Sequence, residues 1–246
     1  MITNLINMKK VMKAVAALML MITAVCTVGC VKDSGNSSYY GHECVDLGLP
    51  SGTLWATCNV GADKPEGYGN YFAWGEIQPK ETYNWSNYKY SIGDGVWIPN
   101  PGVWENLYLT KYCTLSSLGN NGFTDNQTTL FPEDDAAEAN WSRGWRMPTR
   151  EDWQELLDNT TNIWTTQNGV NGRLFTAANG KSLFLPAAGS SEGDESTRGH
   201  YWSMSLNAGY PHYAMGLYFV SDDCVLIDEC RRDGFSVRPV HSVHVK

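Results

Sequence analysis

The chain has 246 residues, with 18 lysines and arginines against 26 aspartates and glutamates, and a net charge of −8 at pH 7. About 205 residues follow the N-terminal segment, a length that suits one domain with a substantial core. An acidic chain argues against nucleic acid and anionic lipid surfaces as partners.

The first 29 residues are typical of a secretory signal peptide. Three lysines before residue 14 lead into an apolar run that reaches Val28 and contains no carboxylate. A basic n-region followed by an apolar h-region is the pattern of an export signal, which is removed from the mature protein. We therefore exclude residues 1–29 from the fold.

The signal segment ends in Thr27-Val28-Gly29-Cys30, which resembles a bacterial lipobox. The resemblance implies cleavage after Gly29 and lipidation of Cys30, and several acyl chains on one cysteine would anchor the protein to a membrane stably. A plain secreted protein cut near Ala24 is the alternative. We predict an outer-membrane lipoprotein of the cell envelope that is exposed at the surface.

The mature chain carries 15 basic and 26 acidic residues, a net charge of −11, because residues 1–29 contain three lysines and no acid. Residues 30–40 are short, polar and rich in Ser, Gly and Asn, so we expect a flexible tether there. Residues 41–246 contain no second linker and should form one domain.

Cysteine usage agrees with an oxidising compartment. The domain holds an odd number, Cys44, Cys58, Cys113, Cys224 and Cys230, so at least one thiol is free or paired with another chain. We expect one structural bridge, between Cys58 and Cys113. No C-x-x-C spacing occurs, and a zinc site is therefore not predicted.

Turn residues and short aromatic-rich stretches recur along the domain, which favours a mainly β fold with few helices. Residues 54–106 are rich in Gly, Trp and Tyr without clean periodicity, so we expect irregular but well-packed loops there. Two helices are predicted, at 133–141 and 149–159. The second has a capping pair, Thr149 and Asp152, and an apolar face of Trp153, Leu156 and Leu157.

Asn179-Gly180 lies between residues 174–178 and 181–185, which are apolar and β-prone, and predicts a hairpin. Further strands are expected near residues 201–205, 214–220, 225–228 and 235–240. Five tryptophans are candidates for stacking on sugars, although most should belong to the core: Trp74, Trp85, Trp97, Trp104 and Trp164.

Six segments carry a resemblance to a known family: VDLGLPSG (45–52), LWATCNVGA (54–62), YFAWGE (71–76), WRMPT (145–149), LFLPAAG (183–189) and SVRPV (236–240). They are similar to the Fibrobacter succinogenes major paralogous domain family of gut Bacteroidales lipoproteins. The resemblance implies an α+β, C-type-lectin-like fold with short antiparallel strands, two helices and long irregular loops. The formylglycine-generating enzymes are thought to share that fold.

The segment 205–233 resembles the variable region of proteins diversified by retroelements. Ala214, Leu217 and Phe219 would face the core, while Tyr213, Met215, Tyr218 and Val220 would be displayed. The resemblance implies a ligand-binding surface, in which Tyr and Arg are favoured contact residues. The candidate contacts are Tyr210, His212, Tyr213, Met215, Tyr218, Asp222, Asp223, Leu226, Ile227, Asp228 and Arg231.

The sequence therefore predicts a binding protein without enzymatic activity, for a protein or glycan ligand at the cell surface. One alternative is an oxidoreductase related to formylglycine-generating enzymes that uses Cys224 and Cys230, and another is a structural envelope or pilus component. An undiversified binding surface is a third. No cofactor is expected, although Asp194 with Glu195, or Asp222 with Asp223, could bind calcium through oxygen ligands.

Overall fold

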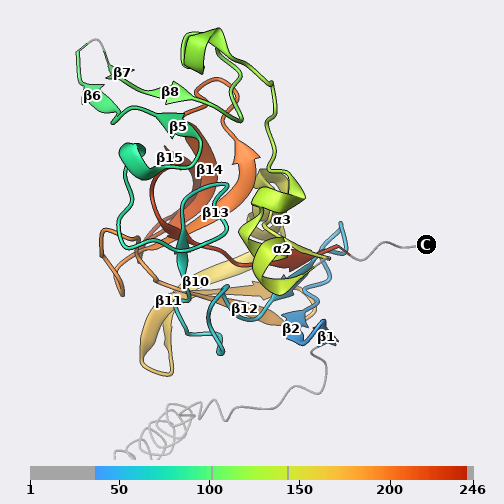
Figure 1. Ribbon diagram of the computed structural model, residues 1–246. Helices are drawn as coiled ribbons and strands as arrows, with labels where there is room; N and C mark the ends of the chain where they lie inside the picture. The colour runs from blue at the N-terminus through green and yellow to red at the C-terminus, as the bar shows by residue number, and fades with distance from the viewer. Residues whose placement is uncertain (1–36, 101, 143, 243–246) are drawn as a thin grey trace, which may run out of the picture. The chain divides into compact units, whose positions relative to one another are not determined.

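A computed structural model describes residues 37–100, 102–142 and 144–242 (Figure 1). The described chain is mostly β, with few helices and strands that pair almost entirely antiparallel. The expectation of a mainly β domain is thus confirmed. The expected signal peptide and Cys30 lie outside the described residues, as does most of the expected tether; its residues 37–39 form the first strand.

Two five-stranded sheets form the centre of the domain. The first has the order β1-β2-β3-β17-β9, with bounds Ser37–Tyr39, His42–Val45, Leu54–Ala56, Val240–His241 and Trp145–Arg146. The second has the order β15-β14-β13-β16-β4, with bounds Cys224–Cys230, Tyr213–Phe219, Gly199–Leu206, Phe235–Ser236 and Tyr71–Phe72. The C-terminal stretch expected as one strand is therefore divided between both sheets.

A three-stranded sheet follows helix α3 in the chain and consists of β10 (Thr160–Gln167), β11 (Val170–Ala177) and β12 (Ser182–Pro186). The predicted hairpin is confirmed as β11–β12. Gly180 has φ 81° and donates from its N–H to the carbonyl of Ala177 at 3.0 Å, a conformation that glycine adopts without strain.

Two short ribbons form from the segment expected to be irregular. They pair β5 (Ser91–Ile92) with β8 (Tyr108–Leu109), and β6 (Val96–Ile98) with β7 (Val103–Glu105). The first ribbon also lies beside the 3-10 turn Trp85–Asn87. The segment 54–106 also contains β3 and β4, and its remainder is loop. Trp74 and Trp85 are buried, so the segment is well packed.

Both predicted helices exist. α3 (Arg150–Asn159) begins as expected, because the Thr149 hydroxyl accepts from the N–H of Asp152 at 3.0 Å and the Asp152 carboxylate accepts from the N–H of Thr149 at 2.7 Å. α2 (Ala136–Trp141) begins three residues later than expected. Asp135 caps it, accepting from the N–H of Ala137 at 2.8 Å, and a separate 3-10 turn precedes it.

The expected bridge between Cys58 and Cys113 is wrong, since all five cysteines of the described chain are free. Cys44 and Cys113 are buried in the apolar core, where a free thiol packs as a small hydrophobic group. The Cys113 thiol donates to the carbonyl of Leu115 at 3.2 Å. These thiols thus contribute packing and not crosslinking.

Candidate ligand-binding site

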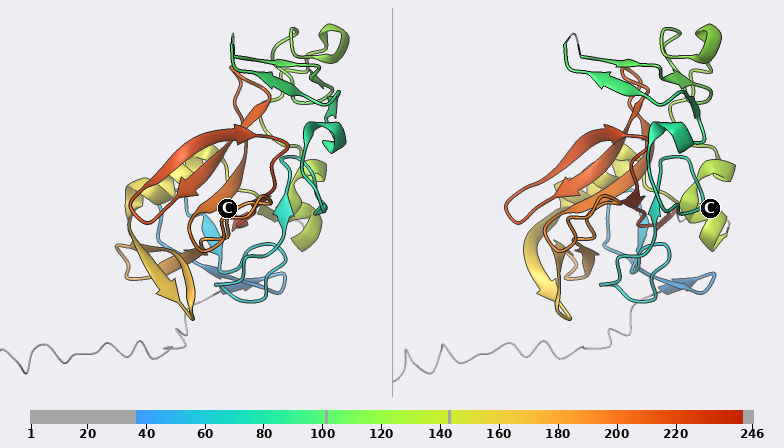
Figure 2. Two further views of the ribbon diagram at one scale, coloured as in Figure 1. Left: turned by 90° about the vertical axis from the view of Figure 1, so that its left-hand side faces the viewer. Right: turned by 60° about the vertical axis from the view of Figure 1, so that its left-hand side comes forward.

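The C-terminal segment forms a sheet with one face on the core. Leu217 and Phe219 of β14 are buried in a cluster with Trp153 and Leu156 of α3. Tyr218 lies between them and points to the opposite face, because successive side chains alternate along a strand. Its ring lies 4.9 Å from that of His200. Figure 2 shows α3 behind this part of the sheet, so the other face is turned to the viewer.

The framework pattern in β14 is the one that the sequence predicted. Ala214, Leu217 and Phe219 are buried, whereas Tyr213, Met215 and Tyr218 keep part of their surface exposed. Leu217 and Phe219 belong to the core cluster on the α3 side, whereas Ala214 lies on the face of Tyr218 and belongs to the other core cluster. The partly exposed Tyr218 can be exchanged without opening either cluster.

β15 divides the remaining candidates between two faces. Ile227 pairs with Gly216 and belongs to the open face with Tyr218, while Asp222 and Asp223 lie in the exposed turn before β15. Leu226 faces the other way and packs on the core, so it is not displayed as expected. Met215 and Asp228 lie on the same face as Leu226. The Asp228 carboxylate accepts from the Asn207 amide at 2.7 Å.

Arg231 is the clearest correction to the predicted contacts. Its side chain is fully buried, with the guanidinium carbon 4.9 Å from the ring centre of Trp74. Nε donates to the Tyr88 hydroxyl at 2.9 Å, and Nη1 donates to the carbonyls of Tyr112 at 3.0 Å and Pro211 at 2.8 Å. Arg231 therefore joins segments far apart in the chain and cannot contact a ligand.

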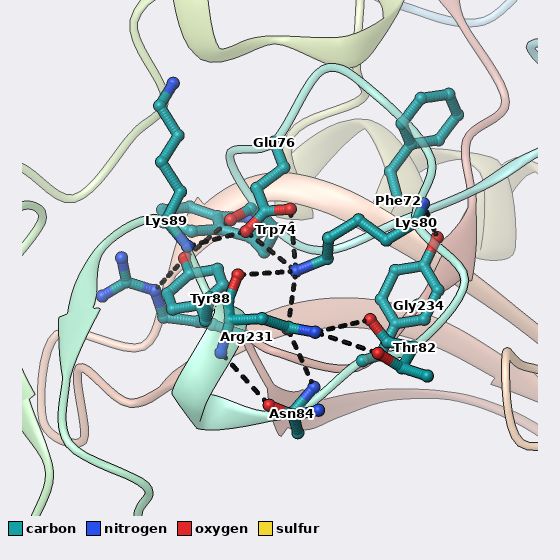
Figure 3. Close-up of polar contacts among 12 residues, drawn as sticks. Phe72, Trp74, Glu76, Lys80, Thr82, Asn84, Tyr88, Lys89, Arg231 and Gly234 are labelled. Atoms are coloured by element: carbon teal, nitrogen blue, oxygen red, sulfur yellow. Dashed lines mark hydrogen bonds and ion pairs between the residues drawn. The ribbon is translucent and has the colours of Figure 1, made fainter.

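Figure 3 shows the network around this guanidinium. The Tyr88 hydroxyl that receives Arg231 donates in turn to the carbonyl of Trp74 at 2.7 Å. Glu76 accepts from the N–H of Lys89 at 2.7 Å and pairs with the Lys80 ammonium at 2.9 Å. A hollow of about 340 Å³ borders these groups, but its charged groups already have protein partners. We interpret the network as a structural clamp.

A pocket of about 270 Å³ brings three predicted contacts together. Tyr210 and His212 come from the loop that leads into β14, Tyr213 is the first residue of β14, and the facing wall comes from the β6–β7 hairpin. The pocket is lined by Trp97, Gly102, Val103, Trp104, Ser117, Leu118, Tyr210, His212 and Tyr213. It brings three of the eleven predicted contacts into one concavity.

Aromatic rings form much of this pocket. Trp97 and Trp104 are cross-strand neighbours with ring centres 5.4 Å apart. The His212 ring lies 4.2 Å from that of Tyr213 and 6.3 Å from that of Trp104. Trp97 is 44% exposed and Tyr210 62% exposed, so their faces are open to an incoming group.

Comparison with known proteins finds no matching family model, no matching curated protein and no matching solved structure.

The pocket is electrically neutral near pH 7. None of its lining residues is an acid, a lysine or an arginine. His212 is only 7% exposed, and burial, together with the nearby charge of Arg231, lowers its pKa to about 4. Its Nδ1 has no hydrogen-bond partner among the described residues. His212 was expected on the surface, but it forms the buried part of the pocket.

The sequence named Trp97 and Trp104 among five candidates for stacking on sugars, but it did not join them to the predicted ligand contacts. The available signal was a pair of tryptophans on either side of a Pro-Asn-Pro-Gly turn, the composition of a short hairpin. Trp74 and Trp85 are core residues, as expected. Trp164 packs against the second core cluster.

Cys224 and Cys230 cannot act as a redox pair. They occupy the two ends of β15, which places them about 20 Å apart at a rise of roughly 3.3 Å per residue. A disulfide needs Cα atoms closer than about 7 Å. Burial raises the pKa of the Cys224 thiol to about 11 and that of Cys230 to about 12, which also disfavours thiolate chemistry.

Metal and membrane features were sought in the same residues. No group of three or more His, Cys, Asp and Glu side chains suited to a metal ion occurs in the described ranges. Asp194 and Glu195, like Asp222 and Asp223, lie on the surface. Within residues 37–242, apart from 101 and 143, no helix is both long and apolar enough to cross a membrane.

Proposed function

We propose that this chain is a lipid-anchored binding protein of the cell envelope that recognises its ligand through its C-terminal segment. The observation that carries the proposal is the aromatic pocket, because Tyr210, His212 and Tyr213 meet there with two tryptophans. Concave, mostly apolar sites with a few polar groups are the usual form of a ligand site. A C-type-lectin-like fold is part of the proposal, and the two helices with short antiparallel strands support it.

The sheet behind the pocket suits a segment whose residues are exchanged. Tyr218 and Ile227 are partly exposed, and the turn residues Asp222 and Asp223 are exposed. Substitution at such positions usually changes stability by no more than about 0.5 kcal/mol. We propose that residues 205–233 are diversified on this support, with the buried Leu217 and Phe219 kept constant.

The position of the pocket supports display away from a membrane. The β1–β2 hairpin, where the chain enters the domain, lies at one end, and the β6–β7 hairpin lies at the opposite end in both Figures 1 and 2. A lipid on Cys30 would attach the domain through its β1 end. The pocket would then face the medium, which suits recognition at the cell surface.

The proposal is tested by binding of small uncharged rings to the full-length chain in mild detergent, measured by saturation-transfer difference NMR. The probes are indole, p-cresol, cyclohexanol and a set of methyl glycosides. We expect at least one to bind the wild type and to lose binding in the Trp97→Ala, Tyr210→Ala double variant. Tyr40→Ala, which removes an equally exposed tyrosine at the other end, is the control.

Binding that survives in the double variant would show that the pocket is not the site. The anchor is tested separately with an alkyne-labelled fatty acid in growing cells. Wild-type protein should take up the label and partition with membranes, while Cys30→Ser should do neither. Uptake of label by Cys30→Ser would contradict the anchor.

A further inference from the structure

We infer that the aromatic pocket binds a single uncharged sugar ring, stacked on Trp97 and Tyr210. This inference rests on the proposed function and names the ligand class of the same site.

The lining of the site gives no partner to an anionic ligand. A buried carboxylate or phosphate needs a cationic partner, yet the lining residues include no lysine or arginine, and His212 is neutral near pH 7. The mature chain also carries a net charge of −11, which repels anions over longer distances. Aromatic faces attract cations, so the charged probes below include glucosamine, an ammonium sugar.

The size of the site limits the occupant to one ring. Pockets for drug-sized molecules hold roughly 300–1,000 Å³, and this one holds about 270 Å³. An extended peptide or an acyl chain would leave most of its length outside. A longer glycan can still bind through one terminal or branching residue while the others remain in solvent.

The walls present flat apolar faces with polar groups at their edges. Trp97, Trp104, Tyr210 and Tyr213 supply the faces, and two phenolic hydroxyls and the Ser117 hydroxyl supply polar groups. Tyr and Trp are suited to surfaces that are apolar on one side and wet on the other. A pyranose has the matching form, with C–H groups on its faces and hydroxyls around its rim.

The test compares neutral and charged sugars on the full-length chain by saturation-transfer difference NMR. The neutral probes are methyl glycosides of glucose, galactose, mannose, fucose, xylose and N-acetylglucosamine. The charged probes are glucuronic acid, N-acetylneuraminic acid and glucosamine. We expect transfer to the ring C–H protons of at least one neutral glycoside and to none of the charged sugars. Trp97→Ala and Tyr210→Ala should each abolish it, and Tyr40→Ala should not.

The failure of this inference differs from the failure of the proposed function. If indole or p-cresol binds in the pocket and no neutral glycoside does, the pocket is a ligand site but the sugar assignment is overturned. If the charged sugars bind as well as the neutral ones, the assignment is also overturned. If no ring binds at all, both the pocket proposal and the sugar inference fail.

Discussion

The guanidinium Nη1 of Arg231 donates to the carbonyl oxygen of Pro211 at 2.8 Å. This bond ties the end of β15 to the loop that supplies Tyr210 and His212 to the pocket. The same guanidinium donates to the carbonyls of Lys111 at 3.1 Å and Tyr112 at 3.0 Å, which lie shortly before the Ser117–Leu118 part of the wall. Arg231, which the sequence predicted as a ligand contact, thus supports two walls of the pocket.

Arg231→Ala should lower the free energy of unfolding by more than about 3 kcal/mol, because it leaves several buried carbonyls without a donor. Arg231→Lys should also destabilise the fold, since an ammonium cannot reproduce the planar fork of donors. Urea unfolding followed by tryptophan fluorescence measures both. Arg198→Ala, at an exposed ion pair, is the matched control and should change stability by less than about 1 kcal/mol. Normal stability of Arg231→Ala would contradict the supporting role.

Neighbouring positions in β14 should differ sharply in tolerance. Leu217→Ala removes a fully buried side chain and should cost about 2–5 kcal/mol. Tyr218→Ala alters the open face and should cost far less, within about 1 kcal/mol. Thermal unfolding of the two variants compares them directly. Equal losses would show that the sheet is not a support on which outward residues can be exchanged.

His212 should make stability depend on pH in the mildly acid range. Burial lowers its pKa from an ordinary 6.5 to about 4, so the folded state resists protonation. The stability associated with the neutral ring is complete above pH 6.5 and is lost as the pH falls towards 4. Asp135 and Asp233, whose pKa values burial raises to about 6 and about 7, act in the opposite direction. The quantity to measure is therefore the difference in the free energy of unfolding between wild type and His212→Phe. This difference should shrink as the pH falls from 6.5 to 4.

Asp134 should control stability in stronger acid. Burial alone would raise its pKa, but the Lys111 ammonium at 2.5 Å and the hydroxyls of Tyr90 and Tyr112 lower it to about 2. Stability from this carboxylate is present above its ordinary pKa of 3.8 and is lost as the pH falls through 2. Asp134→Asn should be less stable than wild type at pH 6 and should approach it at pH 2. A constant difference across that range would rule out the charged cluster as the cause.

The thiols of the folded domain should all be reduced and slow to react. Burial raises the pKa of Cys44 to about 11, and also raises that of Cys58 and Cys113. Iodoacetamide at pH 8 should modify them slowly in the native chain and rapidly in urea, as counted by intact mass. Dithiothreitol should leave the melting temperature unchanged. A drop in melting temperature with reductant would reveal a disulfide that the structure lacks.

Local signals in the sequence predicted the local structure well. The Thr149 and Asp152 cap and the glycine of the Asn179-Gly180 turn act within a few residues, so their patterns suffice to locate α3 and the β11–β12 hairpin. β10 was missed, because Thr160–Gln167 is threonine-rich and lacks apolar alternation. It is a strand because β11 pairs with it along its whole length.

The candidate site was predicted only in part, for reasons of distance along the chain. Tyr210 and His212 come from the segment that was singled out, but Trp97 and Trp104 lie more than a hundred residues earlier, and no local pattern links the two segments. Arg231 was misassigned because arginine is rarely buried completely. Its carbonyl partners are 20 to 120 residues away, so no residue near Arg231 in the sequence indicates that its side chain is buried.

The last strands of the domain have a consequence for how the protein is made. β16 lies between β13 and β4 in one sheet, and β17 lies between β3 and β9 in the other. Neither sheet can close until residues 235–241 have left the ribosome. Synthesis from the N-terminus therefore leaves both central sheets incomplete until these residues are made.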